Sequence, residues 1–185
     1  MTQKIIIGLV GPIASGKGEV KAYLQKNYSA TEHRFSTMLR DVLDRMHIEQ
    51  SRKNMQDVST ILRQRFGEDL LAKVLTEDVK NDNHELIVID GIRRMADIIY
   101  LTELPEFHLV SIDADEEIRY QRVLSRNENA GDSEKSFADF QKDAQAETEL
   151  TIPEVMGTAK EKLQNNGKIE ELHANIDKLL GSLRR

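Results

Sequence analysis

The sequence predicts one α/β domain in which a mostly parallel sheet of about five strands lies between two layers of helices. Short apolar runs at residues 4–10, 86–90 and 107–113 are typical of strands buried on both faces, and longer segments of helical spacing separate them. Alternating strands and helices imply crossover connections and hence a parallel sheet. The 185 residues suit a single domain spanning 1–185, and no repeat or linker divides the chain.

Strands are expected, in chain order, at residues 4–10, 31–35, 86–90, 107–113 and 159–163. Helices are expected where apolar residues recur every three or four positions, at 19–27, 38–46, 55–66, 70–79, 95–104, 115–126, 137–149 and 169–180. Ser136 and Asp139 resemble a capping box at the start of the helix at 137–149, and Ile152 and Pro153 break the helical pattern after it.

Composition excludes several classes of protein. The chain has 26 Lys and Arg against 32 Asp and Glu, a net charge of −6, which argues against sequence-independent binding of nucleic acid. Local arginine clusters can still bind a small anion. The absence of Cys excludes disulfide scaffolds, thiolate zinc sites and cysteine nucleophiles. No basic start precedes an apolar stretch, and no apolar run approaches the ~20 residues of a membrane span. We therefore expect a cytoplasmic monomer or homodimer with no membrane partner.

The strongest motif follows the first strand, at the sheet edge where ligands of parallel sheets bind. It reads Gly11-Pro12-Ile13-Ala14-Ser15-Gly16-Lys17-Gly18, which matches the phosphate-loop pattern of glycine, four residues and Gly-Lys. The glycines let the backbone curl so that several N–H groups point inward, and the following helix adds its positive end. Lys17 is expected to contact the β- and γ-phosphates. The sequence therefore predicts a P-loop NTPase fold that binds ATP, a small-molecule nucleotide.

One position departs from that pattern, because Gly18 replaces the hydroxyl residue that normally ligates magnesium. Glu19 follows, and its carboxylate could act on Mg²⁺ through water or be an ordinary acid of the first helical turn. Asp90, which closes the apolar run at 86–90, is the expected magnesium-side carboxylate, directly or through water.

Arginines gather after the later strands. Arg93 and Arg94 follow Asp90 and Gly91, where guanidinium forks suit a phosphate. Arg119, Arg122 and Arg126 lie three and four residues apart, so they share one face of the helix at 115–126. Three like charges on one face repel one another unless an anion meets them, and transferring phosphoryl groups are stabilised by positioned cations.

At residues 11–18, 36–40, 90–94 and 119–126 the chain resembles the nucleoside monophosphate kinase group of phosphate-loop kinases. Adenylate kinases carry Gly-Lys-Gly in the loop and Asp-Gly-Phe-Pro-Arg after the second buried strand, where this chain has Asp-Gly-Ile-Arg-Arg. The run Ser-Thr-Met-Leu-Arg at 36–40 resembles their Ser-Thr-Gly-Asp-Met-Leu-Arg, shortened by two residues. The resemblance implies that Thr37 and Arg40 contact the acceptor, together with Arg93, Arg94 and Arg119.

The same resemblance implies that Arg122 and Arg126 act in catalysis beside Lys17 and Asp90. It further implies a helical acceptor-binding insertion at 36–82 and a short lid at about 127–151. That segment is acidic and contains no arginine, unlike the long lids of adenylate kinases.

The chain also resembles dephospho-coenzyme A kinases and related uncharacterised nucleotide-kinase-like proteins, in the Asp-Gly-Ile-Arg run and in the stretch Asn-Asn-Gly-Lys-Ile-Glu-Glu-Leu at 165–172. Two acceptors therefore stay open. A nucleoside monophosphate needs no general base, whereas the hydroxyl of dephospho-coenzyme A needs a carboxylate, for which the neighbourhood offers Glu32, Asp41 and Asp44. We expect a phosphate-bearing acceptor because of the arginines. The alternative of another class is a regulatory nucleotide-binding ATPase, and no guanine signature of the form Asn-Lys-x-Asp supports a GTPase.

Overall fold

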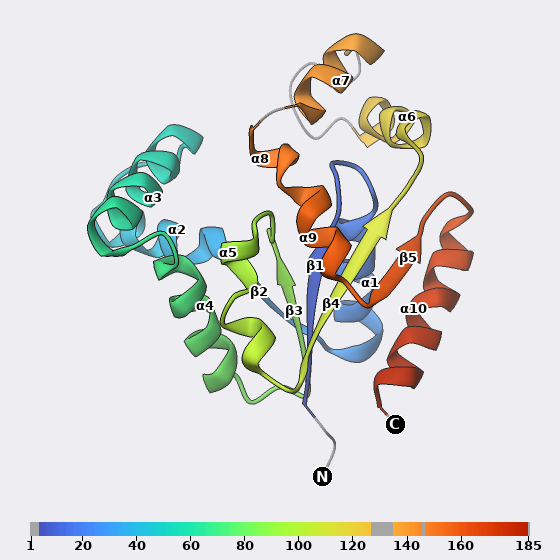
Figure 1. The fold of residues 1–185 in the computed structure, drawn as a ribbon, viewed down its shortest axis with the longest axis horizontal. Coiled ribbons are helices and arrows are strands. Elements are labelled where there is room, and N and C mark those ends of the chain that lie inside the picture. Colours follow the sequence, from blue (N-terminus) through green and yellow to red (C-terminus); the bar gives the residue numbers. More distant parts are fainter. Residues whose placement is uncertain (1–3, 127–134, 146, 185) are drawn as a thin grey trace.

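The computed structural model describes residues 4–126, 135–145 and 147–184. A five-stranded sheet in the order β2-β3-β1-β4-β5 forms the middle layer, and every paired neighbour is parallel (Figure 1). The strands are β1 (Ile5–Val10), β2 (Thr31–Arg34), β3 (Leu86–Asp90), β4 (Phe107–Asp113) and β5 (Glu161–Gln164). The predicted three-layer α/β/α fold with a parallel sheet is confirmed.

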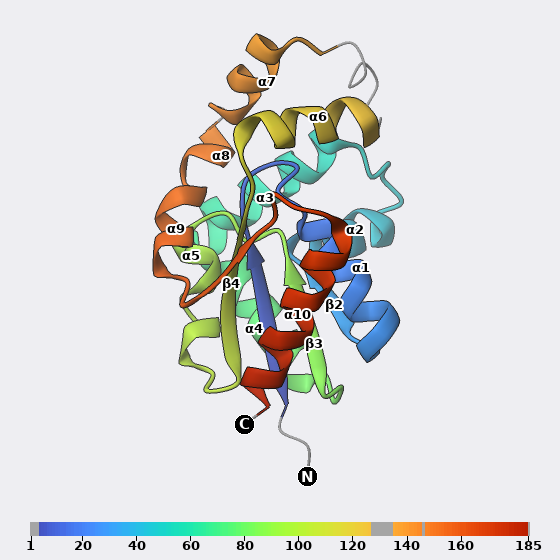
Figure 2. The same ribbon diagram turned by 90° about the vertical axis from the view of Figure 1, so that its right-hand side faces the viewer.

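Helices connect the strands. Their bounds are α1 (Lys17–Tyr28), α2 (Phe35–Arg45), α3 (Arg52–Phe66), α4 (Leu70–Asn81), α5 (Met95–Ile98), α6 (Glu116–Arg126), α7 (Phe137–Ala144), α8 (Glu147–Leu150), α9 (Ile152–Thr158) and α10 (Ile169–Leu183). In Figure 1, α2, α3 and α4 lie on one side of the sheet, while α6 and α7 lie beyond its carboxyl edge, where the strand arrows point. Figure 2 shows α1 and α10 side by side on one face.

The two faces of the sheet have separate cores because successive side chains of a strand point to opposite faces. Ile5, Ile7 and Leu9 of β1 pack into a cluster with α1 and α10, whereas Ile6 and Val10 pack into a second cluster with α4 and α9. All six residues of β1 are buried, which explains why this strand reads as a continuous apolar run. The central strand therefore holds the loop that follows it on a rigid support.

Two predicted helices are each divided in the structure, and a further helix, α9, was not predicted. The helix expected at 95–104 is a four-residue turn, α5, followed by a short 3-10 helix at Leu101–Glu103. Buried Asp97 accepts hydrogen bonds from the backbone N–H groups of Arg93 and Arg94 and so starts the first turn. The segment at 137–149 contains two helices, α7 and α8. Pro153 stands in the first turn of α9, where its missing N–H is not needed, so the break after α8 is also the start of another helix.

Within the residues that the structure describes, no helix is both long and apolar enough to cross a membrane.

Candidate nucleotide-binding and phosphoryl-transfer site

The loop between β1 and α1 curls tightly beside the end of β4. A Cβ at Gly11 would overlap the carbonyl oxygen of Ile112, so only glycine lets the chain pass there. Gly16 has a φ of 111°, a conformation that favours glycine, and it caps α1. Ala14 also adopts positive φ, at 59°. These conformations turn the loop back on itself, which is the geometry that a phosphate cradle needs.

Lys17 folds into this loop. Its Nζ donates to the carbonyl oxygens of Gly11 and Pro12 at 2.6 and 2.9 Å. The ammonium therefore already lies over the concave side of the loop, where an entering phosphate would compete with the two carbonyls for it. Gly18 is not required by packing, because a Cβ there would meet open space.

Two of the three predicted arginines of α6 reach the same loop. Arg119 Nη1 donates to the Ile13 carbonyl at 3.4 Å, and its guanidinium lies 5.5 Å from the ring centre of Phe140 in α7. Arg122 Nη1 donates to the Ala14 carbonyl at 3.5 Å. Burial lowers the pKa of Arg122 below its usual value, although an arginine remains charged at neutral pH. The side chain of Arg126 lies outside the described residues.

Asn165, which was not predicted as a site residue, holds the loop in place through hydrogen bonds. Its Nδ2 donates to the Ser15 carbonyl at 2.8 Å, and its own carbonyl oxygen accepts from Arg122 Nη2 at 2.7 Å. It is 6% exposed and lies where a Cβ on Gly16 would have to be. The sequence signal for it was its place in the stretch at 165–172, which resembles dephospho-coenzyme A kinases. Asn165 therefore connects β5, the phosphate loop and α6.

Glu19, in the first turn of α1, contacts a histidine of α10. Its Oε1 lies 2.8 Å from Nε2 of His173 in α10, and the His173 ring stacks on Tyr23 at 4.0 Å between ring centres. This pairing ties the first turn of α1 to α10.

Glu32 of β2 and Asp90 at the end of β3 share a lysine partner, and the register of the two strands places Arg34 opposite Asp90. Lys21, one turn after Lys17 on α1, donates to Glu32 at 2.9 Å and to Asp90 at 3.3 Å. Arg34 also pairs with Glu32 and lies 3.8 Å from Asp90. Lys21 therefore links Asp90, the expected magnesium-side carboxylate, to Glu32, one of the three carboxylates that the sequence offered as a general base.

The donor set at this edge fits Mg²⁺ only in part. Nowhere in the described ranges do three or more His, Cys, Asp or Glu side chains gather so that they could hold a metal ion by themselves. Glu32 and Asp90 supply two carboxylates, and Mg²⁺ commonly takes one or two carboxylates together with substrate phosphates and waters. The residues present therefore fit a magnesium ion that arrives with a nucleotide.

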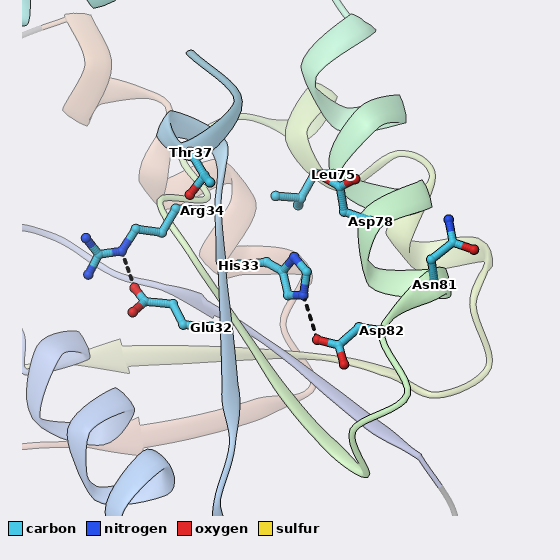
Figure 3. Close-up of a pocket in the computed structure, with 8 residues that line it drawn as sticks. All are labelled: Glu32, His33, Arg34, Thr37, Leu75, Asp78, Asn81 and Asp82. Atoms are coloured by element: carbon cyan, nitrogen blue, oxygen red, sulfur yellow. Dashed lines mark hydrogen bonds and ion pairs between the residues drawn. The ribbon is translucent and has the colours of Figure 1, made fainter. Parts of the chain in front are cut away.

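The predicted acceptor residues are dispersed. Arg40 donates to Gln50 at 2.9 Å on the exposed side of α2. Thr37 lines a cavity of about 450 Å³ beside edge strand β2, shown in Figure 3 with its eight lining residues. Three of those residues, Glu32, Asp78 and Asp82, carry carboxylates, so this cavity does not suit a phosphate. It does adjoin the Glu32 cluster.

Arg93 and Arg94 diverge although they are neighbours in sequence. Arg93 donates to Glu149 of α8 at 2.9 Å, and its carbonyl accepts from the Thr151 hydroxyl at 2.8 Å. Arg94 has a different partner and donates to Asp97 of α5 at 3.4 Å. The structure therefore brings Lys17, Arg119 and Arg122 together, and it separates Arg40, Arg93 and Arg94 from one another.

Together the fold and the phosphate loop define a protein with a P-loop kinase-like fold. A family model described as an AAA domain matches residues 7–148, and the chain belongs to that family. It is 26% identical over 183 residues to a UPF0200 protein of Methanoregula boonei, covering 97% of this chain and 98% of the other, and 23% identical over 180 residues to one of Hyperthermus butylicus, covering 97% and 95%.

Solved structures show the same fold over nearly the whole chain. TT1252 from Thermus thermophilus matches with a TM-score of 0.63 and 17% identity, covering 98% of each chain. Shikimate kinase from Bacteroides thetaiotaomicron matches with a TM-score of 0.61 and 13% identity, covering 96% of this chain and 98% of the other.

Proposed function

We propose that the protein is an ATP-dependent phosphotransferase that moves the γ-phosphoryl group of ATP to a small phosphate-bearing acceptor, a nucleoside or deoxynucleoside monophosphate. The observation that carries this proposal is the convergence of Lys17, Arg119 and Arg122 on one curled loop. A protein that only binds a nucleotide does not need arginines from a second helix beside the phosphate loop. Phosphoryl transfer does, because charge spreads over the equatorial oxygens in the transition state.

Each side chain then has a definite task. Lys17 exchanges its two carbonyl partners for the β- and γ-phosphates, while the loop N–H groups hold the phosphate chain. Arg119 and Arg122 neutralise the oxygens of the transferring group. An oxygen of the acceptor phosphate attacks the γ-phosphorus, the bond to the β–γ bridging oxygen breaks, and ADP leaves with that electron pair. The attacking oxygen is ionised at neutral pH, so no general base is needed.

A magnesium ion bound with ATP would supply further neutralisation of the phosphate charge, and Asp90 with Glu32 would hold it. Lys21 positions both carboxylates at the loop edge.

The position of Glu32 favours a second candidate, transfer to a hydroxyl acceptor as in dephospho-coenzyme A kinase. A hydroxyl must lose its proton during attack, and a carboxylate on β2 can accept it. Against this candidate, Glu32 already accepts from Lys21 and pairs with Arg34. Both partners contact the same oxygen, Glu32 Oε1, which is then not free to accept a proton from a substrate hydroxyl.

The test is transfer of labelled phosphate from ATP with Mg²⁺ to a panel of ribonucleoside and deoxynucleoside monophosphates and dephospho-coenzyme A. Lys17→Ala and Arg122→Ala are each expected to lower turnover by roughly 100-fold or more. Lys26→Ala, an exposed lysine on the same helix α1, is the matched control and keeps wild-type turnover.

Melting temperatures show whether each variant is folded. Near-wild-type transfer by folded Lys17→Ala would overturn the proposal. If ATP binds but every acceptor stays unphosphorylated, the protein is a regulatory nucleotide-binding ATPase instead.

A further inference from the structure

Arg63 of α3 is a charged residue that has no role in the proposed reaction as described above. Its side chain is only 14% exposed, and its Nε is buried without a hydrogen-bond partner among the described residues. The nearest carboxylate is Glu68, whose Oε2 lies 4.0 Å from Arg63 Nη1, beyond hydrogen-bond distance. A guanidinium is always charged and has five donors, so this burial leaves donor capacity without an acceptor.

A second arginine approaches the same oxygen. Arg94 Nη1 also lies 4.0 Å from Glu68 Oε2, although Arg94 comes from the segment after β3 and Arg63 from α3. Glu68 is 73% exposed and stands in the short turn between α3 and α4. One loosely held, solvent-exposed carboxylate thus sits between two guanidinium groups that could each donate more than they do.

The surrounding contacts fix Arg94 and the turn that carries Glu68. Arg94 is the residue before α5, and its Nη2 donates to Asp97 at 3.4 Å, which leaves Nη1 turned toward Glu68. The turn that carries Glu68 is held by Asp69, which accepts from the Tyr100 hydroxyl and pairs with Lys73 at 3.0 Å. Because the frame is anchored on Asp69, Glu68 can swing away without disturbing either arginine.

We infer that Arg63 and Arg94 form an oxyanion site that takes the phosphate group of the acceptor, with Glu68 as the exposed carboxylate that this phosphate displaces. This inference rests on the proposed phosphotransferase function. A phosphate offers three oxygens, whereas Glu68 offers only Oε2, which lies 4.0 Å from each arginine. A phosphate also matches the fork geometry of guanidinium groups. Arg94 follows β3, which pairs with β1, so the site lies on the acceptor side of the phosphate loop.

The same geometry explains why the other predicted acceptor arginines are dispersed. Arg40 is engaged with Gln50 and Arg93 with Glu149, while the cavity beside β2 is lined by carboxylates. Of the basic side chains on the described helical insertion, Arg63 is the one with a buried and unpartnered donor atom. The insertion therefore contributes its phosphate contact through α3 and not through α2.

The test uses inorganic phosphate as the probe, added to the full chain whose phosphate loop is saturated with ADP and Mg²⁺. Arginine Nε–Hε resonances are followed by NMR while phosphate is titrated. The Arg63 and Arg94 resonances are expected to shift together. Arg63→Gln and Arg94→Gln each weaken binding by about 10- to 100-fold, the loss of charge-assisted hydrogen bonds. Glu68→Gln tightens it about two- to fivefold, because an exposed competing charge is gone.

Arg65→Gln is the matched control, since Arg65 is an exposed neighbour on α3 that stacks over Phe66. It leaves phosphate affinity unchanged. If Arg63→Gln has a lowered melting temperature, the phosphate affinities of Arg63→Lys and Glu68→Gln test the site instead. Arg63→Lys keeps a positive charge at position 63, and Glu68→Gln leaves Arg63 and its packing unchanged. An unmoved Arg63 resonance, or wild-type affinity in these variants, overturns the site.

The two proposals fail separately. If no acceptor is phosphorylated while phosphate still binds through Arg63 and Arg94, the result supports the oxyanion site and contradicts the phosphotransferase function. If transfer is active and the KM for the acceptor is the same in Arg63→Lys, Glu68→Gln and wild type, the function stands and the site falls.

Discussion

Asn165 packs directly against Gly16, and this contact joins the strand at the far side of the sheet to the phosphate loop. The Asn165 Nδ2 donates to the Ser15 carbonyl at 2.8 Å, in the space that a side chain on Gly16 would need. Ser15 is fully buried, so its carbonyl has no water to replace a lost donor. The shape of the loop therefore depends on a residue 149 positions later, since the chain numbers them 16 and 165.

Asn165→Ala is expected to lower the free energy of unfolding by about 1–3 kcal/mol, because a buried carbonyl and one donor of Arg122 lose a partner. ATP affinity should fall as well, since the loop is no longer held from behind. Urea unfolding and ATP titration measure the two effects. Gln164→Ala, a change at the exposed last residue of β5 directly before Asn165, is the control. Equal values for the two variants would show that the contact does not support the loop.

The sequence predicted the parts of the fold that depend on local pattern. The bounds of β3 and β4 agree with the expected 86–90 and 107–113, because a strand buried on both faces leaves an uninterrupted apolar run. The phosphate loop was readable because its conformation requires glycine at fixed spacing. The helix expected at 95–104 was too long, since the carboxylate of Asp97 caps a tight turn that apolar spacing does not reveal.

The parts of the site that sequence reasoning missed depend on which elements become neighbours. Glu32 joins Asp90 only because β2 pairs with β3 in one particular register. Arg63 and Arg94 approach the same carboxylate oxygen only because the turn between α3 and α4 brings Glu68 near the start of α5. Spacing along the chain correctly placed Arg119 and Arg122 on one face, yet it could not distinguish Arg93 from Arg94, which point to different partners.

Lys21→Met is expected to make the protein more responsive to magnesium. Lys21 bridges Glu32 and Asp90, and only the half-exposed Arg34 would then remain near both carboxylates. Their mutual repulsion should lower the melting temperature by about 2–4 °C, the shift for roughly 1 kcal/mol in a chain of this size. Mg²⁺ without nucleotide should restore much of that loss, because two carboxylates attract a divalent cation.

The control for this experiment is Lys26→Met, which removes an exposed lysine of the same helix. A melting temperature of Lys21→Met that does not respond to Mg²⁺ would show that Glu32 and Asp90 do not act as a pair.

Asp82 is expected to make part of the free energy of unfolding depend on pH. Burial alone would raise its pKa, but hydrogen bonds from His33, from the backbone and ring of His84 and from the Thr31 hydroxyl outweigh burial and lower the pKa well below the usual value. A carboxyl group with a lowered pKa stabilises the fold above its unfolded pKa of 3.8, and that contribution is lost as the pH falls toward the folded pKa.

The stability difference between wild type and Asp82→Asn should therefore be full near pH 7, about 1–3 kcal/mol, and should shrink below pH ~4. Urea unfolding at several pH values measures it. Asp57→Asn on exposed α3 gives the background pH trend. A difference that stays constant from pH 7 to 3 would contradict the role assigned to the Asp82 hydrogen bonds.

Arg93 and Glu149 are expected to be energetically coupled, since their ion pair holds α8 against the segment that follows β3. Arg93 is 48% exposed and Glu149 only 14%, so the pair lies at the boundary between water and protein. Double-mutant analysis with Arg93→Ala and Glu149→Gln should give a coupling free energy of about 0.5–1 kcal/mol at low salt. The coupling should diminish in 1 M NaCl, where the Debye length is about 3 Å. The Thr151 hydroxyl still donates to the Arg93 carbonyl in all these variants, so α8 should stay docked and the fold intact.

A phosphate that bound Arg93 would release Glu149 and lower the coupling, whereas a phosphate bound at Arg63 and Arg94 would leave it unchanged. Measuring the coupling with and without inorganic phosphate therefore tells which of the two neighbouring arginines serves the acceptor.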